Sequence, residues 1–316
     1  MSLFAPFIVC ALALTLDRLL GEPSHWHPLV GFGRMVTAIE KQFNTHPTRP
    51  WQSMLKGSAA LLLVTLPILG VAVWLSMLLD SFWLLITQAI VLWLALSLRG
   101  LTEHGLAVAQ PLHSGDLATA QEQVSRIVSR QASALDEQGV AAAATESMLE
   151  NGADAVFASL FWFLVGGIPG VVLHRLINTL DAMWGYRSPR FLYFGRPAAR
   201  LDDILGWLPA RLTALTYTLL GQRKLALQCW RRQAPQWDSP NAGPVMAAGA
   251  GALNVRLGGP SPYPSGIKQR PILGGTQAAD AGSIEAAIGL VQHGVWLWLA
   301  VIGLVTLLIF VTGLAA

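Results

Sequence analysis

The chain has 316 residues, of which 53% are apolar and 12% are charged, whereas about 25% of the residues in a typical soluble domain are charged. With a mean hydropathy of +0.49, this composition indicates a membrane protein. The net charge of +3 is too small to indicate a nucleic-acid partner, and the two cysteines, Cys10 and Cys229, form no disulfide framework.

Four stretches are apolar enough to cross a bilayer as helices. They are residues 3–20, 55–79, 82–98 and 290–315. The first has no Lys or Arg before its apolar run, and Asp17-Arg18 follow that run near the end of the stretch, which favours an uncleaved membrane helix over a signal peptide. We therefore expect a polytopic, all-α integral membrane protein with about four spanning helices.

A fifth apolar stretch, residues 155–173, is interrupted by Gly-Gly-Ile-Pro-Gly at 166–170. Glycine and proline can break a helix at membrane depth when protein or water satisfies the freed backbone groups. Thirteen of the 21 Lys and Arg residues lie in 175–284. If the broken segment enters and returns on one side, all polar loops share that side, as the positive-inside rule favours. We predict a re-entrant segment near 155–175, an outside N-terminus and cytoplasmic motif-bearing loops.

The remaining segments fit one membrane-embedded domain, residues 1–316, in three regions. Residues 1–98 hold the N-terminal membrane helices and a motif loop at 17–34, residues 99–284 are motif-rich, and residues 285–316 form the last membrane helix. Within the middle region we expect a helix that starts at Ser114, an interfacial helix at 201–220, and a helix over 239–259. The last of these has Ser239 as N-cap and Pro240 at its first position, and 258–266 is predicted to be a loop.

Standard cofactor signatures are missing from the sequence. It contains no G-x-x-x-x-G-K-[ST], no H-E-x-x-H and no C-x-x-C, and "GAGALN" at 249–254 lacks the third glycine of a dinucleotide fingerprint. Any nucleotide must therefore be bound in another way.

The first candidate site is an acidic helix face beside the broken segment. Glu146, Glu150 and Asp154 are four residues apart, and Asn151 lies among them. Oxygen ligands of this kind suit magnesium, which usually takes one or two protein carboxylates together with phosphate and water. The alternative is a solvated acidic stripe on a surface helix, and the sequence leaves both open.

Two further candidates follow the broken segment. His174, Asn178 and Asp181 fall on one helical face, which indicates either a functional site in a membrane setting or polar contacts between helices. Arg196 and Arg200 also share a face. They suit a bound phosphate or carboxylate, or an ordinary surface ion-pair set that includes Asp203 at i+3 from Arg200.

The fourth candidate follows the first membrane helix. Pro23 and Pro28 stiffen a loop that carries His27, and Arg34 follows two glycines. A histidine of this kind is more often structural than catalytic, and the nearby arginine keeps a functional role open.

Five segments in this order resemble the CobD/CbiB family of cobalamin biosynthesis, the membrane adenosylcobinamide-phosphate synthases. They are "LDRLLGEPSHWHPLVGFGRMV" (16–36), "ESMLENGADAVFASLF" (146–161), "GGIPGVVLHRLINTLDAMWGY" (166–186), "FGRPAARLDDILGWLPARLTAL" (194–215) and "SPNAG" (239–243). The resemblance covers about residues 15–275. It implies a carbon–nitrogen ligase that joins aminopropanol, or its O-phosphate, to the f-propionate of adenosylcobyric acid.

The resemblance also implies Mg²⁺ and ATP, with a corrinoid as substrate. The candidate metal ligands are Glu146, Glu150, Asp154 and Asp181. The candidate cofactor-binding residues are Arg34, Asn178, Arg196, Arg200, Ser239 and Asn241. The candidates for catalysis are His27, Asp203 and Arg200, with His27 or Asp203 taking the proton from the incoming ammonium.

We expect the protein in the cytoplasmic (inner) membrane, in contact with lipid, with its active site facing the cytoplasm and no nucleic-acid partner. Other cobalamin-assembly proteins are candidate partners. Two alternatives are a transporter and a non-catalytic scaffold subunit of a cobalamin-assembly complex. The small number of clean spanning helices, and the lack of a second copy of the broken segment, speak against the transporter.

Overall fold

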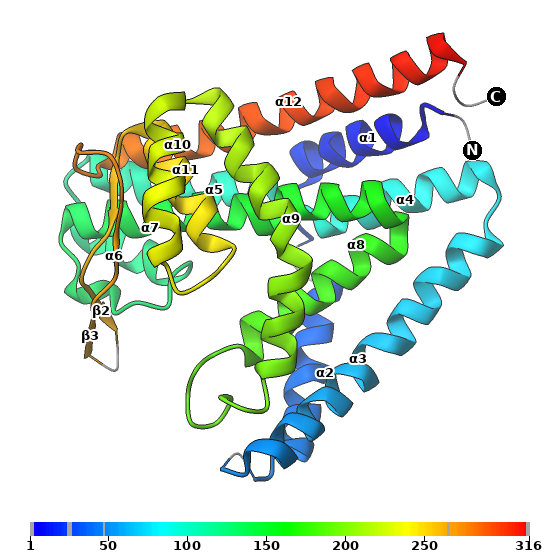
Figure 1. Cartoon of the computed structure of the whole chain (residues 1–316), viewed down its shortest axis with the longest axis horizontal. Coiled ribbons are helices and arrows are strands. Elements are labelled where there is room, and N and C mark those ends of the chain that lie inside the picture. Colours follow the sequence, from blue (N-terminus) through cyan, green and yellow to red (C-terminus); the bar gives the residue numbers. More distant parts are fainter. Residues whose placement is uncertain (1–2, 24–26, 47, 264–265, 314–316) are drawn as a thin grey trace. The chain divides into compact units, whose positions relative to one another are not determined.

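Helices make up most of the chain, and the predicted all-α membrane fold is confirmed (Figure 1). The structure is a computed structural model that describes residues 3–23, 27–46, 48–263 and 266–313, so residues 24–26 of the predicted motif loop lie outside the described residues. Two compact units interleave along the sequence, one of residues 1–97, 158–206 and 302–316, the other of residues 98–157 and 207–301. The predicted division of a single domain into 1–98, 99–284 and 285–316 stays a prediction.

Within the described residues, four helices are long and apolar enough to cross a membrane. They are Pro50–Leu78, Ser81–His113, Glu137–Trp184 and Ala281–Thr312. Three cover most of the apolar stretches predicted at 55–79, 82–98 and 290–315, and the fourth contains the broken segment. Helix α1 (Ala5–Leu20) forms as predicted, but its 16 residues are fewer than the roughly 20 that a spanning helix needs.

The predicted break in the fifth apolar stretch is confirmed at Gly167. Helix α8 (Ala158–Trp184) contains this one non-helical residue, with φ 56° and ψ −142°, a conformation that essentially only glycine adopts. Beyond it the chain folds back (Figure 1). Gly170 then lies so close to the carbonyl of Trp162 that a Cβ atom at position 170 would collide with it. A π-helical turn, η2 (Gly152–Phe157), precedes α8.

The first unit is built from α1, α2 (Pro28–Phe43), α3 (Pro50–Leu78), α4 (Ser81–Ala95), α8, the first part of α9 (Arg196–Leu220) and the end of α12 (Ala281–Thr312). Helices α3 and α4 meet at a tight turn where Asp80 accepts hydrogen bonds from the amides of Phe82 and Trp83 (Figure 1).

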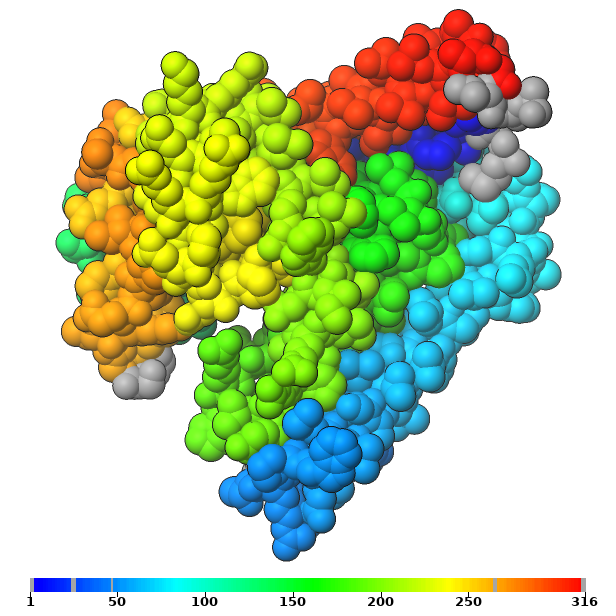
Figure 2. Space-filling view, in the orientation of Figure 1, coloured from blue at the N-terminus to red at the C-terminus, as the bar shows by residue number. Residues whose placement is uncertain are grey.

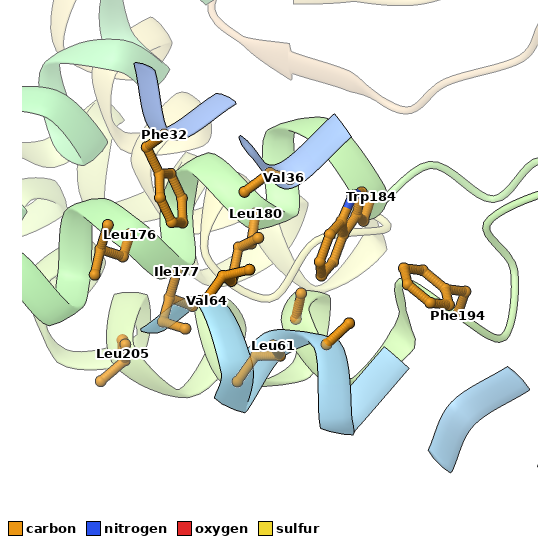
Figure 3. Packing of buried hydrophobic residues seen from close by; sticks show 12 residues of the cluster. Phe32, Val36, Leu61, Val64, Leu176, Ile177, Leu180, Trp184, Phe194 and Leu205 are labelled. Carbon is orange, nitrogen blue, oxygen red and sulfur yellow. The ribbon is translucent and has the colours of Figure 1, made fainter. Parts of the chain in front are cut away.

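An apolar core holds α2, α3, α8 and α9 together within this unit. Figure 3 shows Phe32 and Val36 of α2, Leu61 and Val64 of α3, and Ile177, Leu180 and Trp184 of α8 packed against one another. Phe194 and Leu205 complete the cluster from the segment that leads into and along α9. Because these side chains leave water together, they fix the polar face of α8 relative to α9.

The second unit contains α5 (Leu98–His113), α6 (Leu117–Ser125), η1 (Ala132–Ala134), α7 (Glu137–Asn151), η2, the end of α9, α10 (Arg223–Gln233), η3 (Ala234–Gln236), α11 (Ala242–Leu253), short strands between residues 256 and 274, and the start of α12. The predicted helix start at Ser114 is wrong, because Asp116 accepts from the Thr119 amide and α6 begins at Leu117. Asp116 is the N-cap because its side chain reaches the free amide of the third helical residue, Thr119.

The predicted loop after α11 contains β-structure in the second unit. Strand β1 (Arg256–Gly258) pairs antiparallel with β4 (Ile272–Gly274), and β2 (Ser261–Tyr263) pairs with β3 (Gly266–Lys268). Helix α11 packs against α10 and β4, and Figure 2 shows the yellow and orange surfaces of these segments side by side. Its many small residues, such as Gly251 against the backbone of Ala226, allow this close approach.

Candidate functional site

A polar cavity of about 360 Å³ lies in the second unit, beside the acidic helix face predicted from the sequence. Glu146, Ser147, Glu150 and Asn151 of α7 line it. The opposite lining comes from Ser129 and Arg130, from the segment 237–239, and from residues 263 and 268–271 of the β-strand region. Segments far apart in sequence thus bring carboxylate, amide, hydroxyl and guanidinium groups to one cavity.

Glu146 is the centre of a buried ion-pair network at the wall of this cavity. Arg270 binds it through Nη1, 2.7 Å from Oε2, and Nη2, 3.2 Å from Oε1, and Arg130 donates to Oε2. The Gly258 amide donates to Oε1 at 2.8 Å. The side chains of Glu146, Arg130 and Arg270 are only 4%, 8% and 6% exposed. Protein donors therefore occupy both carboxylate oxygens, and a metal role for Glu146, which stays a prediction, requires some of these donors to move.

The other members of the acidic face have different surroundings. Glu150 and Asn151 are exposed at the cavity, and the Asn151 amide donates to the Ser147 hydroxyl at 2.9 Å. Asp154 is half-buried in the π-helical turn. Burial and the nearby Asp154 carboxylate raise the pKa of Tyr217. The metal roles of Glu150 and Asp154 stay predictions, and Glu150 is the one that faces the cavity.

Ser239 and Asn241, predicted as cofactor-binding residues, lie at the start of α11. The Ser239 hydroxyl accepts from the amides of Asn241 and Ala242, at 3.3 and 3.1 Å, but the helix begins at Ala242, so Pro240 is not its first residue. Arg211 donates to Asn241 Oδ1 at 2.9 Å and stacks over the ring of Trp207, 4.4 Å from its centroid. Asn241 is therefore held by an arginine, and Ser239 lines the cavity.

A second cluster, in the first unit, joins the polar faces of α8 and α9. The Asn178 side-chain amide lies 3.5 Å from Asp202 Oδ1, and Arg175 donates to Asn178 Oδ1 at 3.4 Å. Burial, together with the negative charge of Asp181, raises the pKa of the Asp202 carboxyl to about 7. Carboxylates of α8 and α9 therefore face each other closely enough to repel, an arrangement that a bound cation would relieve.

Glycine keeps room for one of these carboxylates. The Gly185 amide donates to the Asp181 carbonyl oxygen at 2.6 Å, and a Cβ atom at position 185 would collide with the Asp181 carboxylate. A larger residue at the end of α8 would therefore displace Asp181.

A basic cavity of about 510 Å³ adjoins this cluster within the first unit. Arg187, Arg196 and Arg200 line it together with Asp203, Tyr186 and Tyr193. Burial raises the pKa of Asp203, and the positive charge of Arg187 acts in the opposite direction. The structure thus places Arg196, Arg200 and Asp203 at one cavity, where planar guanidinium groups suit a phosphate or carboxylate ligand.

His27 lines a separate cavity of the first unit, of about 320 Å³, with Arg175 and Glu22. Arg34 is exposed on α2, and its predicted role in cofactor binding stays a prediction. In the part of the chain that the structure describes, no group of three or more His, Cys, Asp or Glu side chains is arranged to hold a metal ion. Magnesium needs only one or two protein carboxylates, so the predicted metal site is not excluded on this ground.

The predicted residues fall into two sets. One set lies in the first unit, namely His27, Arg34, Asn178, Asp181, Arg196, Arg200 and Asp203, and the other in the second unit, namely Glu146, Glu150, Asp154, Ser239 and Asn241. Each unit gathers most of its own set around cavities, and convergence of both sets into one pocket stays a prediction.

Sequence reasoning missed the arginines that hold Glu146. Arg130 and Arg270 lie 16 and 124 positions from it, and no local spacing links them. The only signal was that a buried carboxylate in an apolar protein requires a cationic partner, and the segment around Glu146 contains none. Arg187 was also missed, although it lies one residue beyond the "GGIPGVVLHRLINTLDAMWGY" segment.

Comparison with known proteins agrees with the resemblance in the sequence. The family model described as "CobD/Cbib protein" matches residues 10–291. "Cobalamin biosynthesis protein CobD" of Stutzerimonas stutzeri is 57% identical over 290 residues, which cover 92% of this chain and 94% of the relative. The proteins of the same name from Chromobacterium violaceum and Rhodobacter capsulatus are 53% and 38% identical, over 95% and 92% of this chain and 95% and 93% of the relatives.

No solved structure matches the chain significantly, so the family assignment rests on sequence. The apolar helices and polar cavities of this chain agree with that assignment. A family match across most of the chain and relatives of high identity lead to one conclusion: this chain belongs to the CobD/CbiB family of cobalamin biosynthesis.

Proposed function

We propose that this protein is an ATP-dependent amide synthase that joins aminopropanol, or its O-phosphate, to the f-propionate of adenosylcobyric acid. The product is adenosylcobinamide or its phosphate. The observation that carries this proposal is the basic cavity, where Arg187, Arg196 and Arg200 lie together with Asp203. It combines cations for phosphate with a carboxylate that can accept a proton.

The chemistry explains why such a cavity is needed. A carboxylate does not react with an amine at neutral pH, because its oxygen is a poor leaving group. Transfer of a phosphoryl or adenylyl group from ATP to the carboxylate oxygen releases ADP or pyrophosphate and creates a good leaving group. The amine nitrogen then attacks the acyl carbon, phosphate or AMP leaves, and the ammonium loses its proton to a base.

Arg196 and Arg200 would bind the phosphate groups and stabilise negative charge that develops on them. Asp203 would accept the proton from the ammonium, since its raised pKa makes it a better base than an ordinary aspartate. Magnesium would neutralise phosphate charge; its candidate ligand in the first unit is Asp181, and Glu150 and Asp154 are separate candidates within the second unit. We place the protein in the cytoplasmic membrane with these cavities open to the cytoplasm.

The decisive experiment uses the full chain, purified in detergent or nanodiscs. It is incubated with adenosylcobyric acid, Mg-ATP and either aminopropanol or its phosphate, and the corrinoid product is identified by mass spectrometry. We expect amide product with stoichiometric ADP or AMP, and the nucleotide formed identifies the activated intermediate. Product that forms only when another cobalamin-assembly protein is added would contradict the proposal and favour a scaffold.

Magnesium ligation is tested by Glu150→Ala and Asp154→Ala. Loss of a ligand should raise the Mg²⁺ concentration that gives half-maximal amidation, while the variants still elute as folded protein. Glu137→Ala, an exposed position on the same helix α7, is the control. Undiminished amidation with an unchanged magnesium dependence in both variants would contradict the ligand role.

A further inference from the structure

One nitrogen of His27 has a structural task in the first unit. His27 immediately precedes α2, has extended backbone angles, and its Nδ1 accepts a hydrogen bond from the Leu29 amide at 3.2 Å. Pro28 occupies the first helical position, where its missing N–H costs nothing. His27 is thus the N-cap of α2, a position that Asn, Asp, Ser and Thr usually fill.

This hydrogen bond determines the tautomer of the ring. A neutral imidazole has one N–H donor and one acceptor nitrogen. Because Nδ1 accepts from a backbone N–H, the ring proton lies on Nε2. A base role would require Nδ1 to release the cap, since Nε2 already carries a proton. The geometry therefore favours a hydrogen-bond donor at Nε2 over the predicted base.

The surroundings of His27 supply a second donor. The cavity that it lines also contains Arg175, and Leu29, Val30 and Leu96 form apolar walls. Glu22, the acidic residue of this lining, accepts a hydrogen bond from the Ser97 hydroxyl. The cavity thus combines a guanidinium and an imidazole N–H in a partly apolar setting, in which a charge-assisted hydrogen bond is strengthened.

Arg175 connects this cavity to the carboxylate cluster of the same unit. Its Nη1 donates to Asn178, whose amide lies next to Asp202. An anion bound at Arg175 would therefore lie close to the polar faces of α8 and α9.

We propose that His27 and Arg175 form an oxyanion-binding site, in which His27 Nε2–H and the Arg175 guanidinium donate to the oxygens of a carboxylate or a phosphate. Which molecule carries this anion rests on the proposed function: the corrinoid substrate carries a carboxylate, and ATP or the phosphorylated amine carries a phosphate. Binding of the anion itself does not depend on that function.

Two isosteric substitutions separate the two nitrogens of His27. In His27→Asn, the side-chain oxygen takes the place of Nδ1 and preserves the cap, but nothing replaces Nε2. In His27→Gln, the side-chain amide nitrogen takes the place of Nε2, but the cap is lost. His46→Asn, at an exposed histidine after α2, is the control.

Binding of inorganic phosphate and of propionate to the purified full chain is measured by isothermal titration calorimetry. We expect at least one of the two anions to bind, and His27→Asn and Arg175→Met to weaken it about 10-fold or more, the effect of losing one hydrogen bond to a charged group. His46→Asn should bind as the unmodified protein does. Phosphate bound more tightly than propionate indicates a phosphate source, and the reverse indicates a carboxylate.

Three results would overturn this proposal. They are unchanged anion affinity in a folded His27→Asn, unchanged affinity in Arg175→Met, and no binding of either anion to the unmodified protein. If His27→Gln fails to fold, the result from His27→Asn still decides. Anion binding without amide synthesis would contradict the proposed function alone.

Discussion

Arg270 holds Glu146 through both ends of its guanidinium group, with Nη1–Oε2 and Nη2–Oε1 distances of 2.7 and 3.2 Å. Its Nε and Nη2 also donate to the Gly259 carbonyl and the Ser261 hydroxyl, at 3.2 and 2.9 Å. The pair therefore joins helix α7 to the β-strand region that forms the opposite wall of the polar cavity. Glu146 determines the shape of that cavity by holding both walls.

Removing this carboxylate should destabilise the protein strongly. Glu146→Ala leaves the buried guanidinium groups of Arg130 and Arg270 without their carboxylate, and breaking a buried pair in this way costs about 3–5 kcal/mol. Glu146→Gln should cost less, because the amide oxygen can still accept one of the hydrogen bonds. The midpoint of thermal unfolding in detergent measures both effects.

The matched control is Glu122→Ala, which removes an exposed partner of Arg126 on α6 and should change the unfolding midpoint little, because exposed pairs contribute little. Equal midpoints for Glu146→Ala and Glu122→Ala would show that the network does not stabilise the fold.

The break in α8 provides a second stability prediction. Gly167→Ala places a Cβ atom on a backbone with φ 56° and ψ −142°, and such strain costs about 1–3 kcal/mol. Gly166→Ala is a suitable control, because beyond its chain neighbours and the local helix backbone no atom lies within 4 Å of its Cβ position. Thermal unfolding should separate the two variants, and equal stability of both would contradict the reversal at Gly167.

The long helices were predictable because hydropathy over some 20 residues is a strong signal. The break at Gly167 was predictable because Gly and Pro residues interrupt the apolar stretch 155–173. Weak local signals explain the errors. The strands between 256 and 274 have three residues each, too few for an alternating pattern. The site itself was predictable only as separate motifs, since the partners of Glu146 come from distant segments.

The raised pKa of Asp202 predicts a pH-dependent stability. An unfolded aspartate has a pKa of about 3.9, whereas that of Asp202 in the fold is about 7. Between these values the folded state binds the extra proton, so the contribution of Asp202 to stability is most favourable below about pH 4 and falls as the pH rises through about 7.

Asp202→Asn should therefore flatten this dependence and raise the unfolding midpoint at about pH 8, with a smaller effect at about pH 5. The measurement is made with EDTA, because a bound cation would also relieve the repulsion from Asp181. If Asp202→Asn is less stable than the unmodified protein at about pH 8, the raised pKa of Asp202 is contradicted.

The basic cavity gives the last prediction, which concerns substrate affinity. If Arg196 and Arg200 bind phosphate, Arg200→Lys should raise the KM for the phosphate-bearing substrate about 10-fold, because lysine cannot reproduce a planar two-point contact. Arg196→Ala should act in the same direction. The control is Arg126→Ala, which removes an exposed arginine on the other unit and should leave KM unchanged. The KM for ATP and that for the phosphorylated amine are measured separately, and the one that rises shows which phosphate the cavity holds. A fall in kcat with both KM values unchanged would assign these arginines to the reacting centre instead of to phosphate binding.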